Sequence, residues 1–490
     1  MLLMDTRIYT IASAIVIVAN IIFILTTIFF ERKKPIQALA WVLTLAMLPA
    51  LGFILYLVFG RNLRIKKKKS LLIKKEKDRE YSTAVFKTLT NVTYNEEEAK
   101  EYTLEDIKQI IKFNINLSAS PLTKDNKVTV YTDAKYKYED LLKDIKEATS
   151  SIHMLYFIIN NDDIGKKIIN ALAEKAKQGV TVRVLYDHGG SLFTPYKAFN
   201  PILENGGEVK RFFPISFGSY LRVNFRNHRK VVVIDGKIGY VGGINIGDEY
   251  LGMKKKLSPW RDTHLKITGS SVYCLQMRFM EDWYYACRDD FRYDDIMKYF
   301  APINEHEKGN TGIQVVSSGP DTNGEEIKRG MIKMINSANK RILIQTPYFI
   351  PDEPFLEALQ NAALAGIEVI VQIPSIPDKR FVYKVTTSYI SDLLKFNIKV
   401  YQFPGFLHAK MMIVDNAMCT IGTSNIDMRS FALNFEVNAF LYGEEFASKC
   451  TKIFYKDLDI CTQVTQDEYS SRSLFSKIEE GIYRLMSPLL

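Results

Sequence analysis

The feature that most restricts the fold of this chain is an internal repeat. Residues 148–179 and 338–366 resemble one another, since each begins as an apolar strand, continues as a helical pattern and ends at a glycine. A β-branched strand follows each copy, over 180–185 and 367–373. This order is typical of a sheet with helices on both faces. The repeat therefore predicts two copies of one α/β domain, because a repeat of this length is a duplicated domain and not a solenoid unit.

A short polar motif of the form His-x-Lys-x4-Asp occurs once in each copy. The same number of residues separates each motif histidine from a later asparagine. Residues i and i+2 of a strand point to one face, so the histidine and lysine of a motif share a face. The aspartate falls at a hairpin turn, and the later residues return on the next strand. The candidate site residues are His228, Lys230, Asp235, Gly243 and Asn245 in the first copy, and His408, Lys410, Asp415, Ser424 and Asn425 in the second.

These residue types are suited to phosphoryl transfer. Lysine supplies a positive charge and asparagine a hydrogen bond to phosphoryl oxygens, while a neutral imidazole can attack phosphorus. Two facing sets give a nucleophile and an acid/base in one pocket, so we expect neither a metal ion nor a cofactor. A single His-x-Lys would more often be an ordinary strand histidine. Two copies with equal spacing inside matching repeats favour one shared site.

Two apolar runs precede the repeat. Residues 8–30 carry no charge and are long enough to cross about 30 Å of hydrocarbon as a helix. A second run covers 36–59, and Pro49 in its middle is expected to kink the helix. The alternative for the first run is a cleaved signal peptide. Its length and the second run favour a two-helix transmembrane hairpin over residues 1–60.

A basic flank and linker follow the hairpin over residues 61–103. Lysine and arginine in 61–69 outweigh those in 32–34, so the positive-inside rule places the rest of the chain in the cytoplasm. The net charge of +10 favours an anionic partner, either a membrane or nucleic acid. The five cysteines are scattered and include no Cys-x-x-Cys pair, which predicts buried thiols and neither a disulfide framework nor a zinc site.

The paired motifs resemble those of the phospholipase D superfamily. With the two apolar runs and the segments 260–264 and 434–438, nearly the whole chain resembles bacterial cardiolipin synthases of the two-span type. The resemblance implies an α/β fold, with two tandem phospholipase D-like α/β/α sandwich domains that have mixed sheets, after the transmembrane hairpin. We expect these domains over 104–300 and 301–490.

The resemblance also implies a reaction. His228 attacks one phosphatidylglycerol to give a phosphatidyl-histidine and glycerol, and a second phosphatidylglycerol accepts the phosphatidyl group to give cardiolipin. His408 acts as general acid and then as base. The lysines and asparagines of the motifs bind the phosphate, together with Gly243. Asp235 and Asp415 brace the site from behind.

Two further residues have alternative roles. Glu436 is either an acidic site residue or a sheet-edge charge, and Arg226 either holds a second phosphate or anchors the rim. The C-terminal residues 474–490 have apolar residues at helical spacing, for which packing on the core is favoured over a place at the membrane.

Three functions compete on these grounds. They are a lipid phosphatidyltransferase, a phospholipase D that uses water as acceptor, and a nuclease, which gains little from two membrane spans. We expect phosphatidylglycerol and the bacterial cell membrane as partners, with a multi-pass anchor and no nucleic acid. The oligomeric state stays open.

Overall fold

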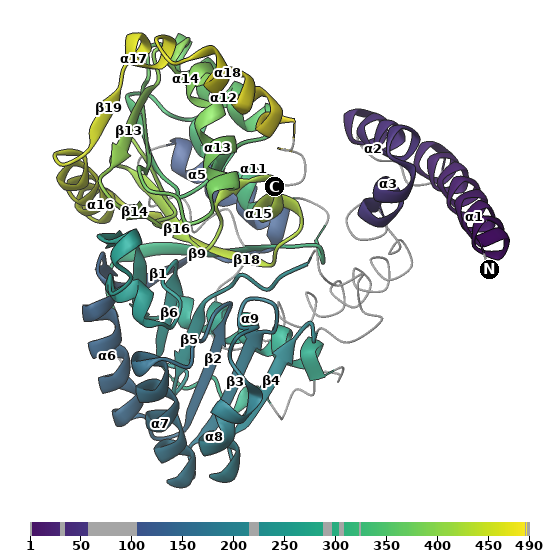
Figure 1. Ribbon diagram of the computed structural model, residues 1–490. Helices are drawn as coiled ribbons and strands as arrows, with labels where there is room; N and C mark the ends of the chain where they lie inside the picture. The colour runs from purple at the N-terminus through teal and green to yellow at the C-terminus, as the bar shows by residue number, and fades with distance from the viewer. Residues whose placement is uncertain are drawn as a thin grey trace. The chain divides into compact units, whose positions relative to one another are not determined.

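The computed structural model describes residues 2–29, 35–56, 105–214, 225–287, 296–302, 308–322, 325–485 and 487. Figure 1 shows an N-terminal helical unit and a larger α/β body, and each is described by itself. The predicted basic flank and linker, 61–103, lies outside the described residues.

The helical unit consists of α1 (Leu2–Phe29), α2 (Pro35–Met47) and α3 (Pro49–Leu55). Among the described residues, one helix is long and apolar enough to cross a membrane, over Tyr9–Phe29. The second apolar run is divided at Leu48, so the kink predicted at Pro49 is confirmed as a break between two short helices. A hairpin with two full spans stays a prediction, and residues 57–59 lie outside the described residues.

A polar side chain of α1 compensates for this break. Proline has no N–H, so the Leu45 carbonyl loses the donor that a regular helix would supply. The Asn20 side-chain amide instead donates to the Leu45 oxygen at 3.2 Å and to the Pro49 oxygen at 2.9 Å. Asn20 therefore both stabilises the break and holds α1 against the short helices.

The body contains one mixed sheet of fifteen strands, whose two halves have mirrored strand orders (Figure 1). The order is β4-β3-β2-β5-β6-β8-β1 in the first half and β9-β18-β16-β15-β10-β12-β13-β19 in the second. The first-half strands are β1 (Thr123–Tyr131), β2 (Ser151–Tyr156), β3 (Thr181–Asp187), β4 (Glu208–Phe212), β5 (Val231–Ile234), β6 (Ile238–Gly242) and β8 (His264–Thr268). The second-half strands are β9 (Thr311–Ser318), β10 (Arg341–Gln345), β12 (Glu368–Pro374), β13 (Lys399–Phe403), β15 (Met411–Val414), β16 (Met418–Gly422), β18 (Glu436–Tyr442) and β19 (Thr462–Val464).

The two halves join where β1 pairs antiparallel with β9, at Thr123–Ile313 and Asn126–Thr311. The mixed sheets implied by the family resemblance are therefore continuous, because two edge strands pair with one another. Within each half, β2-β3-β4 and β10-β12-β13 are parallel, as the strand-helix-strand pattern predicted. The glycines that end the repeated helices, Gly179 and Gly366, have φ of 86° and 87°, a region that favours glycine.

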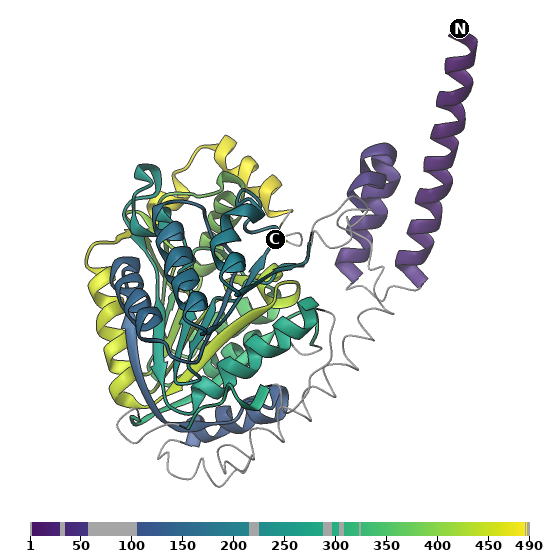
Figure 2. The same ribbon diagram turned by 90° about the horizontal axis from the view of Figure 1, so that it is seen from below.

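Helices cover both faces of the sheet. In the first half, Ile152 and Met154 of β2 pack with α6 (Ala134–Glu147) and α7 (Asp163–Lys177). His153, between them, faces the other side and stacks on Phe279 of α9 (Ser271–Cys287). The alternation of side chains along a strand therefore builds two separate cores, one on each face. Figure 2 gives a second view of these layers.

The second half repeats this arrangement with α11 (Glu326–Ile335) and α12 (Glu353–Leu364) on one face and α16 (Glu444–Leu458) on the other. Its core also includes Ile107, Ile110 and Ile111 of α5 (Glu105–Ser118). The predicted boundary assigns α5 to the first domain, whereas its apolar face packs in the second half. The domain limits otherwise stay a prediction.

Candidate active site

Each motif histidine is attached through its backbone to the opposite half of the body. The N–H of His228, just before β5, donates to the Phe435 carbonyl at 2.9 Å. The N–H of His408, just before β15, donates to the Arg261 carbonyl at 2.6 Å. A two-stranded parallel pair of β14 (Phe406–Leu407) and β7 (Trp260–Arg261) supports the second contact. The first motif is thus bound to the residues just before β18, and the second motif to the residues just before β8. These contacts between the halves bring the two motifs together.

The same segments supply a carboxylate to each imidazole. His228 Nδ1 lies 3.0 Å from Glu436 Oε2, and His408 Nδ1 lies 2.6 Å from Asp262 Oδ2. Glu436 belongs to the second half and Asp262 to the first, so the two pairs cross between the halves. In neither half does the motif histidine pair with a carboxylate of the same half.

These contacts fix the tautomer of each ring. His228 Nδ1 also lies 3.2 Å from the Thr423 carbonyl oxygen, which can only accept a hydrogen bond. The proton therefore resides on Nδ1, and Nε2 keeps its lone pair. For His408 the ionised Asp262 has the same effect. Both rings thus present an unprotonated Nε2, the atom that a nucleophile or a general base requires.

Burial sets the protonation of these groups. It lowers the pKa of His228 and of His408 to about 4, although the neighbouring carboxylates oppose the shift. Burial alone would raise the pKa of Glu436 and of Asp262, but the histidine and lysine beside each carboxyl lower it below its ordinary value. At neutral pH the site therefore holds two neutral imidazoles and two carboxylates.

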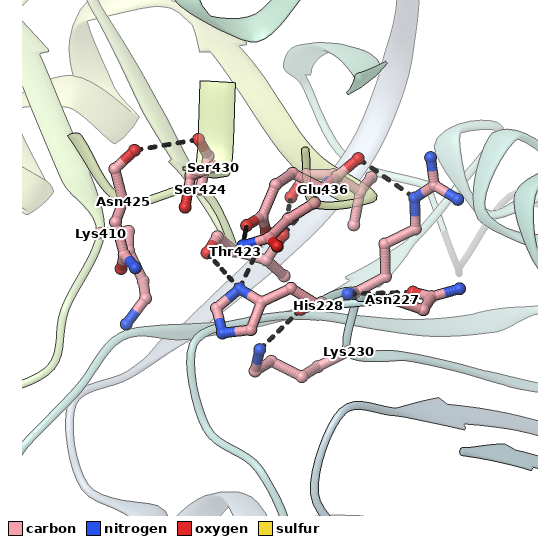
Figure 3. A network of polar contacts seen from close by, with 12 residues as sticks. Asn227, His228, Lys230, Lys410, Thr423, Ser424, Asn425, Ser430 and Glu436 are labelled. Atoms are coloured by element: carbon pink, nitrogen blue, oxygen red, sulfur yellow. Dashed lines mark hydrogen bonds and ion pairs between the residues drawn. The ribbon is translucent and has the colours of Figure 1, made fainter. Parts of the chain in front are cut away.

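The two motif lysines lie beside the histidines and are buried. Lys230 Nζ donates to the His228 carbonyl at 2.6 Å, and Lys410 Nζ makes the equivalent contact with the His408 carbonyl. Burial lowers the pKa of Lys230 to about 7 and that of Lys410 to about 8, and repulsion by Lys410 contributes to the shift of Lys230. Figure 3 shows the His228 ring directed toward Lys410. An anion between the rings would therefore lie beside two lysines, whose protonated form it would favour.

The other predicted phosphate ligands are engaged by the protein. Asn245 Nδ2 donates to the Tyr250 hydroxyl at 3.0 Å, and Asn425 Nδ2 donates to Asp427 at 3.1 Å. A direct contact of either amide with phosphate stays a prediction. The Ser424 hydroxyl donates to the Asn425 carbonyl at 3.1 Å.

Gly243 and Arg226 have structural explanations. A Cβ on Gly243 would lie 2.0 Å from Asp262 Oδ1, so only glycine allows this carboxylate to reach His408. Arg226 Nε lies 4.0 Å from Asp187 Oδ1, and the Arg226 carbonyl accepts from the Phe435 N–H. These contacts agree with the rim-anchor alternative for Arg226.

The motif aspartates lie at the far end of their strands. Asp235 accepts hydrogen bonds from the N–H groups of residues 149–151, and Asp415 from those of residues 339–341. The four residues of β5 or β15 separate each aspartate from its lysine, a rise of about 16 Å along an extended chain. Asp235 and Asp415 therefore stabilise the turn that begins β2 or β10, and the role expected for them of bracing the site stays a prediction. Their positive φ, 54° in each, matches the predicted hairpin.

Sequence reasoning missed Asp262 as a site residue. Gly242 pairs with His264 on β8, and Gly422 pairs with Asn438 on β18. Counting back two residues from each partner gives Asp262 and Glu436. An alignment of the two copies continued past the asparagines would have found both acids, and it would have favoured the site alternative for Glu436.

Two histidines, each oriented by a carboxylate and set beside a buried lysine, define an enzyme that transfers a substituted phosphate group. A family model described as cardiolipin synthase, phospholipase D-like domain, matches residues 141–257 and 331–458. A phospholipase D-nuclease N-terminal model matches residues 18–61. The cardiolipin synthase of Staphylococcus aureus (strain Mu50 / ATCC 700699) is 44% identical over 96% of this chain and 95% of that protein. The major cardiolipin synthase ClsA of Bacillus subtilis (strain 168) is 44% identical over 96% of this chain and 98% of that protein.

The chain belongs to the cardiolipin synthase family of phospholipase D-like enzymes. The family and the apolar helix α1 indicate a membrane protein. Among solved structures, the phosphatidylserine synthase of Haemophilus influenzae Rd KW20 is similar, with a TM-score of 0.57 and 14% identity over 78% of this chain and all of that chain. Similarity at this identity concerns the fold alone.

Proposed function

We propose that the protein is a cardiolipin synthase that transfers a phosphatidyl group from one phosphatidylglycerol to another. The observation that carries the proposal is the crossed pairing of each motif histidine with a carboxylate of the other half. It leaves two unprotonated Nε2 atoms beside two buried lysines. The names of the relatives from Staphylococcus aureus and Bacillus subtilis support the same reaction.

In the first step, Nε2 of one histidine attacks phosphorus of the donor lipid. The bond between phosphorus and the glycerol headgroup oxygen breaks, and the second histidine, protonated, gives its proton to that oxygen as glycerol leaves. Its proton affinity rises when the anionic phosphate binds, because a negative charge favours the imidazolium. Lys230 and Lys410 stabilise the charge that develops on the phosphoryl oxygens.

In the second step, the second histidine, now neutral, takes the proton of the headgroup hydroxyl of another phosphatidylglycerol. The freed oxygen attacks phosphorus, the bond between phosphorus and nitrogen breaks, and the first histidine regains its lone pair. Both histidines are back in their starting protonation state after one cycle. The two histidines and the two lysines therefore account for every bond and proton that changes in the transfer.

We assign His228 as the nucleophile and His408 as the acid/base. His408 makes the shorter contact, 2.6 Å to Asp262, and a short charge-assisted bond favours a ring that must carry a second proton. His228 shares its Nδ1 proton between Glu436 and the Thr423 carbonyl, which orients the ring but stabilises an imidazolium less. This difference supports the assignment.

For the membrane part we propose a multi-pass anchor in the bacterial cell membrane with the α/β body in the cytoplasm. Support comes from the two apolar runs and from the basic residues 61–69 that follow them. Protease protection in sealed vesicles of known orientation tests this topology.

The reaction is tested with the full-length protein in vesicles of phosphatidylglycerol. We expect release of one glycerol for each four-chain lipid formed, measured by an enzymatic glycerol assay and by mass spectrometry of the lipids. Phosphatidic acid as the only product would refute the transferase and favour a phospholipase D, in which water replaces the second lipid.

A further inference from the structure

The C-terminal helix α18 (Leu474–Arg484) turns its apolar face outward. Its large apolar side chains lie within one helical stripe and are more than half exposed, up to 76% for Phe475; they are Leu474, Phe475, Ile478 and Ile482. Leu485, which follows the helix, continues the stripe and is 80% exposed. An amphipathic helix on a soluble surface normally has the opposite orientation.

Polar contacts fix this orientation. Glu480 is buried and accepts from the Tyr469 hydroxyl and from Arg472, and Glu479 pairs with Lys384 at 2.9 Å. Arg484 pairs with Asp392. The helix therefore binds the body through its charged side, against α13 (Arg380–Ser388), and Figure 1 shows α18 beside α13. The expectation that the C-terminal apolar residues pack on the core is wrong for this stripe.

The helix that α18 packs against begins at the same edge of the sheet as the catalytic histidines. Helix α13 follows the carboxyl end of β12, and β5 and β15 begin with the catalytic motifs at the carboxyl ends of β2 and β10. In the loop before α13, Asp378 accepts from the Tyr348 hydroxyl, two residues from Thr346, which contacts Ile426 of the second motif loop. The loop before α13, the helix that α18 packs against, is therefore connected to the second half of the site.

The first half has an equivalent apolar group. The loop after β3, which corresponds to β12, exposes Leu192 and Phe193, the latter to 96%. Asp187 at the end of β3 accepts from the Asn227 N–H, next to His228. Each half thus exposes apolar side chains on elements linked to a strand end near its motif. Exposed basic residues accompany them: Lys197 in the first half, and Lys379, Arg380 and Lys477 in the second.

We propose that the stripe of α18 and the Leu192–Phe193 loop insert into the interfacial layer of an anionic phospholipid bilayer and set the site against its surface. Apolar side chains with basic neighbours are the pattern of an interfacial helix on anionic lipid. The bilayer is favoured over a second copy of the chain because α1 already tethers the protein to a membrane, and the substrates of the proposed function enter from one. Only the argument that the substrates enter from a bilayer rests on the proposed function.

The test uses full-length protein in vesicles of phosphatidylglycerol and phosphatidylcholine, with brominated phosphatidylcholine as a fluorescence quencher. Tryptophan is introduced as Phe475→Trp, Phe193→Trp or, as a matched control, Leu364→Trp. Leu364 is 70% exposed, but it ends α12 at the opposite edge of the sheet. We expect added emission at 475 and 193 to be quenched at least about threefold more than at 364, because bromine quenches only within the bilayer. Equal quenching at all three positions would overturn the proposal.

A second experiment measures the kinetics of the double variant Phe475→Ser with Ile478→Ser. The single variant Leu364→Ser is its control. At low mole fractions of phosphatidylglycerol we expect the apparent interfacial KM to rise about tenfold with kcat retained, since the catalytic groups are untouched. Loss of an oligomer in the double variant, with no bilayer quenching, would assign the stripe to a second copy and refute the proposal. Quenching requires no turnover, so insertion with phosphatidic acid as sole product would refute only the proposed function.

Discussion

The two halves of the body place the same chemistry in different supports. In both, a His-x-Lys segment enters the sheet at a carboxyl edge, and the intervening residue points away from the site. In the first half that residue is Arg229, which is fully buried, bridges to Asp282 of α9 at 2.6 Å and donates to the Glu436 carbonyl at 3.1 Å. In the second half it is Ala409, packed between Phe403 and Leu407. The two copies therefore keep the same residues on the side that faces the site. On the opposite side, one copy has a buried ion pair and the other has apolar packing.

The carboxylates differ as well. The longer Glu436 serves an imidazole that has a second acceptor, and the shorter Asp262 serves one for which no second acceptor was found among the described residues. Because the pairs cross, the two halves cannot act independently. The different surroundings of His228 and His408 can therefore give the two histidines different roles in one shared site.

The largest effect is expected from the histidines. His228→Ala and His408→Ala should each lower turnover at least about 10³-fold, because one removes the covalent carrier and the other the proton carrier. Samples denatured at alkaline pH, where the P–N bond survives, with labelled phosphatidylglycerol should contain phosphohistidine in His408→Ala and none in His228→Ala. The reverse pattern would exchange the two assigned roles, and full activity in either variant would exclude a shared site.

The next largest effect is expected from the buried ion pair between Arg229 and Asp282. Arg229→Ala leaves Asp282 buried without its partner and should lower the free energy of unfolding by about 3–5 kcal/mol. Thermal unfolding in detergent measures the loss. Arg229→Met with Asp282→Leu removes both charges and should recover most of it. If the double variant is as unstable as the single one, the ion pair does not account for the difference between the halves.

The crossed carboxylates should differ in importance. Asp262→Asn is expected to lower kcat about 10- to 100-fold, since an amide N–H can hold the His408 ring in the wrong tautomer. Glu436→Gln should cost less, because the Thr423 carbonyl still holds the proton on His228 Nδ1. Steady-state kinetics on both variants measures the contrast. An equal loss would show that the second acceptor has no effect.

The turn aspartates should affect stability and not chemistry. Asp235→Asn and Asp415→Asn each weaken three hydrogen bonds to backbone N–H groups and should lower the free energy of unfolding by about 1–3 kcal/mol. Activity well below the melting temperature should be kept in both. A large fall in kcat without loss of stability would give the aspartates a part in the chemistry.

The lysines predict the smallest effect, in the pH dependence of kcat/KM. Lysine is charged below its pKa, so phosphate binding to the free enzyme should weaken as pH rises through about 7 for Lys230 and about 8 for Lys410. Above these values kcat/KM should fall by up to about tenfold per pH unit. Lys230→Arg should remove the lower step, because arginine stays protonated. An unchanged profile in Lys230→Arg would assign the decline to another group.

Much of the fold was predictable because it repeats. The glycine stops after two similar helices, the apolar strands and the Asp-Gly and Asp-Asn turns are local signals, and each formed the expected element. The joined sheet was not predictable, since β1 and β9 are ordinary edge strands until they meet. The place of α5 was also missed, because Ile107 and Ile110 fit the apolar core of either half equally well in sequence.

The sequence by itself determined which side chains carry the chemistry. The spacing of two residues puts His228 with Lys230 and His408 with Lys410 wherever the segment before β5 or β15 is extended. The tertiary structure decided what each side chain does. Only the contact between the halves brings Glu436 to His228 and Asp262 to His408 and fixes the protons on Nδ1. A tautomer and a pKa depend on neighbours distant in the chain, whereas a repeated motif depends only on neighbours a few residues away.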